Sequence, residues 1–328
     1  MIKKITITYL LVLLLTSASI SNVFSQNLIV YNSSNSGLPD DGVTCVTPDK
    51  YGAIWIGTSD SGIVKFHNNQ WTRYDSANSG LPENKIRDIV FDRNGIMWVR
   101  YYSKGLGRFD GYNWYLYNQN NSPVITVTSL AVDSSNSKWM TGSGRLMKYN
   151  DSIWTIYDTS NVGYSFTSLQ MNFEGDTLWF AAGLKGLGRY CNGSLTYYNM
   201  QNSGMPDNVA MAIYIDKSRN KWVGTYFGGA AKFNSAQNIW TAFDLADSLG
   251  FTGDNTVNYI IADDSSAYFA YRMTLYRYSR TGFEIIPAGT PTAFEYDRYN
   301  NLWIGNLNGI AIYNPNGIVS VTKDEEII

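Results

Sequence analysis

A segment of about 40 residues recurs throughout this chain of 328 residues, and a fixed repeat restricts the possible folds more than any other feature of the sequence. Residues 35–74 and 78–117 both open with NSGLP, and both carry an Asp six residues before a Trp. Alignment on that Trp gives seven copies, 35 to 46 residues apart. The seven positions are Trp55, Trp98, Trp139, Trp179, Trp222, Tyr268 and Trp303.

The second copy predicts four short strands in each repeat. Residues 86–91 are mostly β-branched or apolar, and the turn residues Asp92 and Gly95 follow that run. Residues 96–99, 106–109 and 112–117 form three further short runs, and the Asp-Gly pair at 110–111 is a hairpin signal. Four strands in a period of about 40 residues indicate an all-β fold, a seven-bladed β-propeller of four-stranded antiparallel blades.

The two ends of the chain predict how the ring closes. Residues 28–31 align with the fourth strand of a repeat, but no first three strands precede them. The seventh copy has three strands and then only a weak apolar run at residues 318–321. We therefore expect the N-terminal strand to join the last blade. In the alternative arrangement, residues 318–321 fill that place and residues 28–31 form a loose arm.

Residues 1–25 are predicted to be a secretory signal peptide, with a membrane anchor as the alternative. Lys3 and Lys4 precede an apolar run at residues 5–15, and cleavage is expected after Ser25. The propeller is expected over residues 26–321, and an acidic tail or linker over residues 322–328. No second long apolar run follows, so we expect an exported protein (periplasmic, cell-surface or secreted) without membrane insertion after cleavage.

The composition argues against several classes of function. A formal net charge of −2 offers no electrostatic surface for nucleic acid or anionic lipid. Cys45 and Cys191 fall at different repeat positions, so no disulfide is predicted and Cys45 is expected in the core. The single histidine, His67, cannot supply the metal cluster or acid–base machinery that a catalytic propeller commonly needs. We therefore expect no metal, no cofactor and no enzymatic activity.

Two charged positions recur with the repeat. The Asp before the Trp is expected to be replaced by Asn172 in the fourth copy and supplied by Asp263 or Asp264 in the sixth. A single Asp with neutral neighbours favours a turn cap over a calcium site. The recurring Lys or Arg favours cross-strand pairing over an anion channel. The acidic set is Asp49, Asp92, Asp133, Asp216 and Asp297, and the basic set is Lys65, Arg108, Lys148, Arg189, Lys232 and Arg277.

Candidate ligand-binding residues lie where the repeat is broken. Loops between the second and third strands, and those between blades, open on one face of a propeller. Arg100 stands where other copies have Gly, Thr or Ala, and two tyrosines follow it. Aromatic faces stack on sugars or peptide side chains, and cationic groups fix orientation. The candidates are Asp60, Arg100, Tyr101, Tyr102, Lys104, Arg145, Lys185, Tyr226, Phe227, Tyr271, Arg272 and Asn306.

The motifs NSGLP(D/E)N, DxxGxxWIGT, GGxxKF and WTxY, repeated at fixed spacing over residues 28–317, resemble the two-component regulator propeller repeat. The resemblance implies a periplasmic sensor propeller of the kind found in hybrid histidine kinases, many of them associated with sensing polysaccharide breakdown products. This sequence departs from that pattern because it contains no kinase domain. It is therefore similar to the secreted, stand-alone members, and its tail resembles the linker before a type IX secretion sorting domain.

Three functions stay open at this point. The leading hypothesis is an exported, non-enzymatic propeller that binds a glycan or a protein on its loop face. The second is a polysaccharide lyase or hydrolase, with Asp60 and Asp207 as its acid–base pair, which requires a separation of roughly 5 to 9.5 Å. The third is a sensor or structural module of a larger surface protein.

Overall fold

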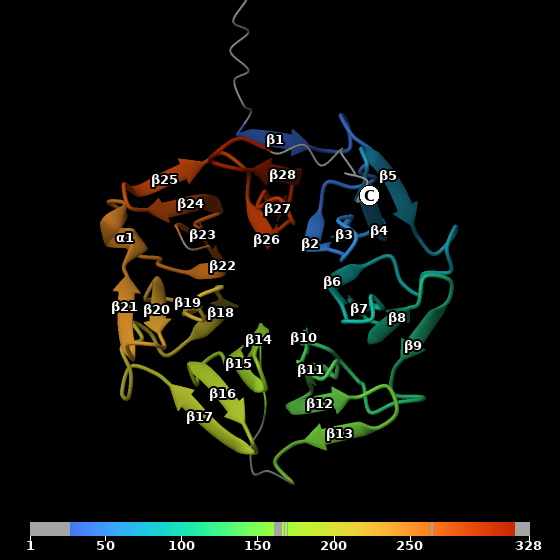
Figure 1. Cartoon of the computed structure of the whole chain (residues 1–328), viewed down its shortest axis with the longest axis horizontal. Helices are drawn as coiled ribbons and strands as arrows, with labels where there is room; N and C mark the ends of the chain where they lie inside the picture. Colours follow the sequence, from blue (N-terminus) through green and yellow to red (C-terminus); the bar gives the residue numbers. More distant parts are fainter. Residues whose placement is uncertain (1–26, 161–165, 167, 169, 264, 319–328) are drawn as a thin grey trace, which may run out of the picture.

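The structure, a computed structural model, describes residues 27–160, 166, 168, 170–263 and 265–318. Seven four-stranded antiparallel sheets surround a common axis as the blades of a propeller (Figure 1). The first strand of each blade lies nearest the axis and the fourth lies at the rim, so the predicted seven-bladed fold is confirmed.

The first three blades follow the chain in order. Blade 1 is β2 (Val43–Pro48), β3 (Ile54–Thr58), β4 (Ile63–His67) and β5 (Gln70–Tyr74). Blade 2 is β6 (Ile86–Phe91), β7 (Met97–Tyr101), β8 (Leu106–Phe109) and β9 (Trp114–Tyr117). Blade 3 is β10 (Ser129–Val132), β11 (Lys138–Gly142), β12 (Arg145–Tyr149) and β13 (Trp154–Tyr157).

The next three blades continue the same pattern, with one short helix. Blade 4 is β14 (Met171–Glu174), β15 (Thr177–Ala181), β16 (Leu187–Cys191) and β17 (Ser194–Tyr198). Blade 5 is β18 (Ala210–Ile215), β19 (Lys221–Thr225), β20 (Ala230–Asn234) and β21 (Ile239–Phe243), and α1 (Leu245–Ser248) follows it. Blade 6 is β22 (Val257–Ala262), β23 (Ala267–Tyr271), β24 (Thr274–Ser279) and β25 (Gly282–Ile286).

Blade 7 contains strands from both ends of the chain. β26 (Pro291–Tyr296), β27 (Leu302–Asn306) and β28 (Gly309–Tyr313) are joined at the rim by β1 (Leu28–Tyr31). β1 pairs antiparallel with β28 over all four of its residues. The predicted closure by the N-terminal strand is confirmed. Of the competing segment, Ile318 packs against the core without forming a strand, and residues 319–321 lie outside the described residues.

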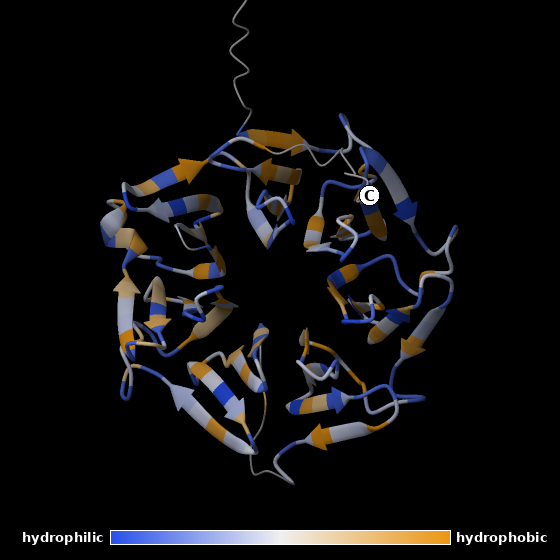
Figure 2. Ribbon diagram, in the orientation of Figure 1, coloured by the Kyte–Doolittle hydropathy of each residue, from blue (hydrophilic) through white to orange (hydrophobic). Residues whose placement is uncertain are grey.

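The repeated Trp fills the space between neighbouring blades. Trp98 and Trp303 are fully buried, as is Tyr268, which replaces the Trp in blade 6. Apolar clusters join adjacent blades, and one of them packs Trp303 of blade 7 against Val46 and Ile54 of blade 1. Figure 2 shows hydrophobic residues in the strands of all seven blades and hydrophilic residues along many of the connecting loops. The core is therefore a ring of interfaces between blades.

The Asp that precedes the Trp caps the turn between the first two strands of a blade. Oδ1 of Asp297 accepts hydrogen bonds from the backbone N–H groups of Tyr299 and Asn301, each at 2.9 Å, and Oδ2 accepts one from Trp303 Nε1 at 2.9 Å. Both oxygens are used, which explains the fixed six-residue spacing. The predicted turn cap is confirmed, and the same indole bond is accepted by Asp49, Asp92, Asp133 and Asp216.

Blades 4 and 6 vary this cap. The expectation for Asn172 is wrong, because Asn172 lies within β14 and the indole of Trp179 donates to Glu174 at 3.2 Å. The longer side chain of Glu174 reaches the indole from one residue closer. In blade 6, Asp263 caps the turn and its Oδ2 accepts a hydrogen bond from the hydroxyl of Tyr296 at 3.0 Å. Asp264 lies outside the described residues.

The recurring basic residue pairs with the Trp across the second and third strands of its blade. Lys65 lies directly opposite Trp55, with Nζ 5.2 Å from the ring centroid, and Lys232 lies opposite Trp222 at 4.7 Å. Ammonium groups at this distance from an indole face make favourable cation–π contacts. The predicted cross-strand pairing of the basic set is confirmed.

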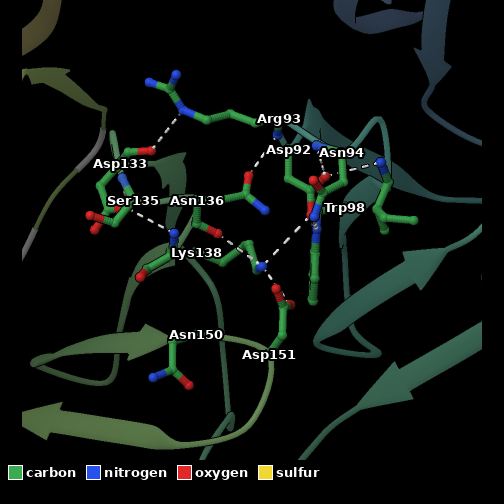
Figure 3. Close-up of polar contacts among 12 residues, drawn as sticks. Asp92, Arg93, Asn94, Trp98, Asp133, Ser135, Asn136, Lys138, Asn150 and Asp151 are labelled. Carbon is green, nitrogen blue, oxygen red and sulfur yellow. Dashed lines mark hydrogen bonds and ion pairs between the residues drawn. The ribbon is translucent and has the colours of Figure 1, made fainter.

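A second kind of lysine is buried between blades. Lys138, just before the Trp of blade 3, is fully buried. Its Nζ donates to the carbonyl of Asn136 at 3.0 Å and to Asp151, and it lies 3.6 Å from Asp92 Oδ2 and 5.0 Å from the centre of the Trp98 ring (Figure 3). Lys221 makes the equivalent bridge from blade 5, to Glu174 at 2.6 Å. These two lysines tie neighbouring blades together through charge.

Both cysteines are free, as predicted, and Cys45 is buried between blades 1 and 2. The predicted signal peptide and acidic tail fall outside the described residues, so both stay predictions. Within the described ranges, the structure contains no helix that is long and apolar enough to span a membrane.

Candidate functional site

The loops between the second and third strands of each blade share one face with the connections between blades. We call this the loop face. The backbone N–H of Tyr102, at the tip of such a loop in blade 2, donates to the carbonyl of Lys85 in the connection before that blade. Tyr226 in blade 5 makes the same bond to Val209. The two kinds of loop therefore form one continuous surface.

The acidic residue of the NSGLP(D/E) motif holds these loops in shape. The carboxylate of Glu83 accepts hydrogen bonds from the N–H groups of Ser103 and Lys104 at 2.9 and 3.0 Å, and from the Ser103 hydroxyl at 2.8 Å. Asp207 accepts one from the N–H of Phe227 at 2.7 Å, and Asp40 accepts one from the N–H of Asp60 at 3.2 Å. The motif therefore builds the surface on which the variable loop residues are presented.

Three of the predicted site residues are buried and do not present their side chains on the loop face. Tyr101 is 3% exposed, Tyr271 0% and Asn306 1%. Each lies three residues after the Trp position and ends the second strand, where Thr58 and Thr225 are equally buried. The prediction that these three side chains contact a ligand on this face is therefore wrong. These three residues share their repeat position with Thr58 and Thr225, and this shared position indicates a structural role for them.

Two predicted cations have other roles. Arg100 lies inside β7, opposite Asp88 of the innermost strand β6 in the strand register, and it lines the axial cavity. Arg272 donates to the carbonyls of Thr252 and Asp254 at 2.6 and 3.2 Å, and its guanidinium stacks 4.8 Å from the ring centre of Phe251. The side chain of Arg272 therefore anchors the long connection between blades 5 and 6.

The other predicted residues lie in the loops, except Arg145, which is the first residue of β12. Tyr102, Tyr226 and Phe227 are exposed by 60%, 42% and 66%, and the two rings of blade 5 lie 4.3 Å apart. Lys104 and Lys185 are exposed too. Asp60 makes an ion pair with Lys85 at 3.2 Å, and Arg145 lies 3.7 Å from Asp158. The structure therefore supports an aromatic and basic surface centred on blades 2, 4 and 5.

Sequence reasoning missed three apolar residues at the loop tips. Leu184 of blade 4, Met273 of blade 6 and Leu307 of blade 7 are 83%, 75% and 58% exposed. Leu184 lies three positions beyond the end of β15, Met273 two beyond β23 and Leu307 one beyond β27, while Tyr102 and Tyr226 directly follow β7 and β19. Exposed apolar side chains therefore occupy the loop tips of five blades. An apolar residue at a repeat position that is otherwise polar or glycine was the available signal.

The axis of the ring holds a cavity of about 980 Å³, lined by the innermost strands of all seven blades. Five of these strands carry a β-bulge near the loop face, and the extra residue of each bulge lines the cavity. A β-bulge changes the direction of a side chain, and here the bulges add five side chains to the lining of the cavity. The bulge residues are Thr44, Arg87, Met211, Asn258 and Thr292.

Ionisable side chains of both signs meet in this cavity. Asp88 and Arg100 of blade 2 face Glu295 of blade 7 and Tyr259 of blade 6, and β22, which carries Tyr259, lies across the ring from β6 (Figure 1). Burial, together with the negative charge of Asp88, raises the pKa of Glu295 to about 7, against the lowering effect of the hydrogen bond from the backbone N–H of Tyr296. Burial also raises the pKa of Asp88, while Arg100 lowers it. The cavity is therefore a partly desolvated, charged site.

The fold is that of a repeat propeller with seven four-stranded blades. Residues 37–60 and 80–102 match the two component regulator propeller family, so the chain carries the repeats of that family. No curated protein matches the sequence.

Solved structures share the fold at low identity. The extracellular domain of a hybrid two component system from B. thetaiotaomicron superposes with a TM-score of 0.70 and 19% identity, over 88% of this chain and 41% of that one. PorZ, a surface component of the type-IX secretion system of Porphyromonas gingivalis, gives 0.64 and 15%, over 85% and 47%. This chain therefore spans less than half of either relative.

A third similar structure is an enzyme. Virginiamycin B lyase from Staphylococcus aureus, in an inactive histidine-to-alanine variant with quinupristin, gives a TM-score of 0.69 and 17% identity, over 87% of this chain and 98% of that one. At these identities all three similarities establish the shared propeller fold alone.

Proposed function

We propose that this protein is an exported, non-enzymatic propeller that binds another protein through its loop face. One observation carries the proposal: apolar side chains are exposed at the loop tips of five blades on the same face. Exposed apolar groups that gather on one surface mark interaction sites. The similar structures include an extracellular domain and a bacterial surface component, and this supports an exported role.

The chemistry of the loop tips favours a protein over a glycan as the ligand. Leu184, Met273 and Leu307 are aliphatic, and such side chains pack against other apolar side chains, whereas sugars prefer flat aromatic faces. Tyr102 and Phe227 add aromatic groups of the kind that are enriched in protein interfaces. Lys104 and Lys185 lie beside these tips, so an apolar partner surface with an acidic rim is the best complement.

The enzymatic alternative has less support. The carboxylate of Asp207 accepts hydrogen bonds from the N–H groups of Val209 and Phe227, and Asp60 pairs with Lys85, so both groups of the suggested acid–base pair are engaged in the loops. His67, the single histidine, is the last residue of β4 and lies opposite Gln70 of β5. It is not one of the described residues that line the axial cavity.

A peptide-display library and a glycan array test the proposal directly. We expect peptides with apolar residues and flanking acids to be enriched, and to lose binding at least tenfold to the variant Tyr102→Ala, Tyr226→Ala, Phe227→Ala. The matched control is Tyr112→Ala, Ile153→Ala, since these exposed residues lie outside the loop face. Binding to glycans alone, or peptide binding that survives the triple substitution, would overturn the proposed protein ligand.

A further inference from the structure

The axial cavity holds opposite charges that are not paired with one another. Among the described residues, no ion pair within 4.0 Å joins Asp88 or Glu295 to Arg87 or Arg100. The carboxylate of Asp88 accepts only the N–H of Ile89 at 3.0 Å. Charged groups in a partly desolvated site are costly unless each finds a partner of opposite charge, so this cavity favours a charged ligand.

Arg100 is the most distinctive of these groups. Its Nε is buried and has no hydrogen-bond partner among the described residues, and its Nη2 makes one long bond of 3.3 Å to the carbonyl of Arg87. The same position two residues after the Trp is Gly57 in blade 1 and Gly305 in blade 7, where an added Cβ would lie 2.5 and 2.7 Å from neighbouring atoms. A guanidinium at a position that is Gly, Thr or Ala in the other copies is a specific departure from the repeat.

Arg87 connects the cavity to the loop face. It is the bulge residue of β6, and its guanidinium stacks 4.5 Å from the ring centre of Tyr102. Arg87 and Arg100 therefore place two positive charges at the mouth of the cavity. In blade 2, Asp88 of β6 lies opposite Arg100 of β7. Glu295 lies two residues further along β26, the corresponding innermost strand of blade 7, so it is roughly 7 Å deeper along the axis.

We propose that this cavity binds a short peptide of two or three residues with free termini, its carboxylate held by Arg100 and Arg87 and its ammonium held by Glu295. A ligand with a single sign of charge would be repelled by half of the cluster, whereas a zwitterion complements both halves. A spacing of roughly 7 Å along the axis matches the distance between the termini of an extended dipeptide. Polar side chains such as Asn258 and Thr292 remain available for the peptide bonds.

The protonation of Glu295 agrees with this assignment. Burial and the charge of Asp88 raise its pKa to about 7, so the group stands close to half ionised at neutral pH. A bound ammonium stabilises the ionised form and lowers that pKa. The bound peptide would therefore supply the compensating charge that Glu295 lacks among the described residues.

Isothermal titration calorimetry at pH 7 with a panel of dipeptides and tripeptides tests the proposal on the intact chain. We expect at least one free peptide to bind, and its N-acetylated and C-amidated forms to bind at least tenfold more weakly. Failure of the whole panel to bind at millimolar concentration, or equal binding of the capped forms, would overturn it. Because the capped ligands are tested on the wild-type protein, this result does not depend on how a variant folds.

Variants then assign the two ends of the peptide. Glu295→Gln should abolish the difference between free and N-acetylated peptide, and Arg100→Gln the difference between free and C-amidated peptide. Lys217→Gln, on an exposed turn outside the cavity, is the control and should bind as the wild type does. Unchanged discrimination in both cavity variants contradicts the proposal. A loop-face variant that keeps Tyr102, Tyr226→Ala with Phe227→Ala, should still bind the peptide, which separates this site from the proposed protein interface.

Discussion

At the scale of single residues, one repeat position holds two tyrosines in opposite hydrogen-bonding states. Tyr101 and Tyr271 both end the second strand of a blade, and both are buried. The hydroxyl of Tyr271 donates to the carbonyl of Asp254 at 2.8 Å, whereas the hydroxyl of Tyr101 is buried without a partner. Burying an unpaired hydroxyl costs free energy that a hydrogen bond recovers.

The two tyrosines should therefore respond in opposite directions to the same substitution. We expect Tyr101→Phe to leave the free energy of unfolding unchanged or raise it by up to about 1 kcal/mol, and Tyr271→Phe to lower it by about 1 kcal/mol. Urea unfolding of the two variants measures this, and each serves as the control for the other. A loss of stability in Tyr101→Phe equal to that in Tyr271→Phe would show that the Tyr101 hydroxyl has a partner.

Lys138 allows a second comparison at this scale. The substitution Lys138→Ala leaves a cavity and an uncompensated Asp92 carboxylate, so we expect it to lower the free energy of unfolding by about 3 kcal/mol. Lys138→Met should cost less, because methionine fills the cavity that alanine leaves, as Met97 does at the same repeat position of the preceding blade, although Asp92 loses its cation in both variants. Chemical denaturation distinguishes the two. Equal losses in both variants would mean that charge, rather than volume, is what this position requires.

The sequence predicts roles that repeat, and it is less informative about those that do not. The spacing between Asp and Trp predicted a turn cap because the same bond recurs in five blades. Arg100 occurs once, and its direction depends on a β-bulge in the facing strand, which leaves no signature in a single sequence. The repeat position of Tyr101 and Asn306, three residues after the Trp, predicts their burial. Their aromatic and polar side chains instead suggest a binding site, and that prediction is wrong.

At the scale of secondary structure, the strand β1 links the two ends of the chain. Ile29 packs against the core between blades 7 and 1, whereas the neighbouring Val30 is 41% exposed. Adjacent residues of a strand face opposite sides, so a substitution of Val30 is the control for the same substitution of Ile29.

We expect Ile29→Lys to lower the free energy of unfolding by at least about 2 kcal/mol, since it places a charge in an apolar interface. Val30→Lys should change it by less than about 0.5 kcal/mol, because that side chain already faces solvent. Deletion of residues 26–34 should lower the melting temperature further than Ile29→Lys does. A melting temperature unaffected by the deletion would contradict closure by β1.

At the scale of the whole molecule, the cavity gathers charges from blades that are not neighbours in sequence. Asp88 belongs to blade 2 and Glu295 to blade 7, and only the closed ring brings them close enough to influence each other. The strand pattern of the sequence predicts the ring, but it does not predict that Asp88 and Glu295 lie close together. The arrangement of side chains in the cavity depends on the closed ring.

Glu295 should make the stability of the ring depend on pH. Its pKa is raised from 4.5 in the unfolded reference to about 7 in the folded protein, so between these values the folded state binds more protons than the unfolded one. Stability should therefore be lost as pH rises from 4.5 to 7, by roughly 3 kcal/mol at most. The measurement is the difference in unfolding free energy between wild type and Glu295→Gln across this range. A difference that stays constant with pH would contradict the raised pKa.

The pairing of β1 with β28 has a consequence for the order of assembly. Of the propeller strands, β1 is made first but is the last to find its partner, because β28 is the last of these strands to be made. Six blades can form as the chain lengthens, while β1 has to wait with its backbone hydrogen-bonding groups unused until β28 has been made. Until then the propeller is an open arc, and the synthesis of β28 is what turns the arc into a ring.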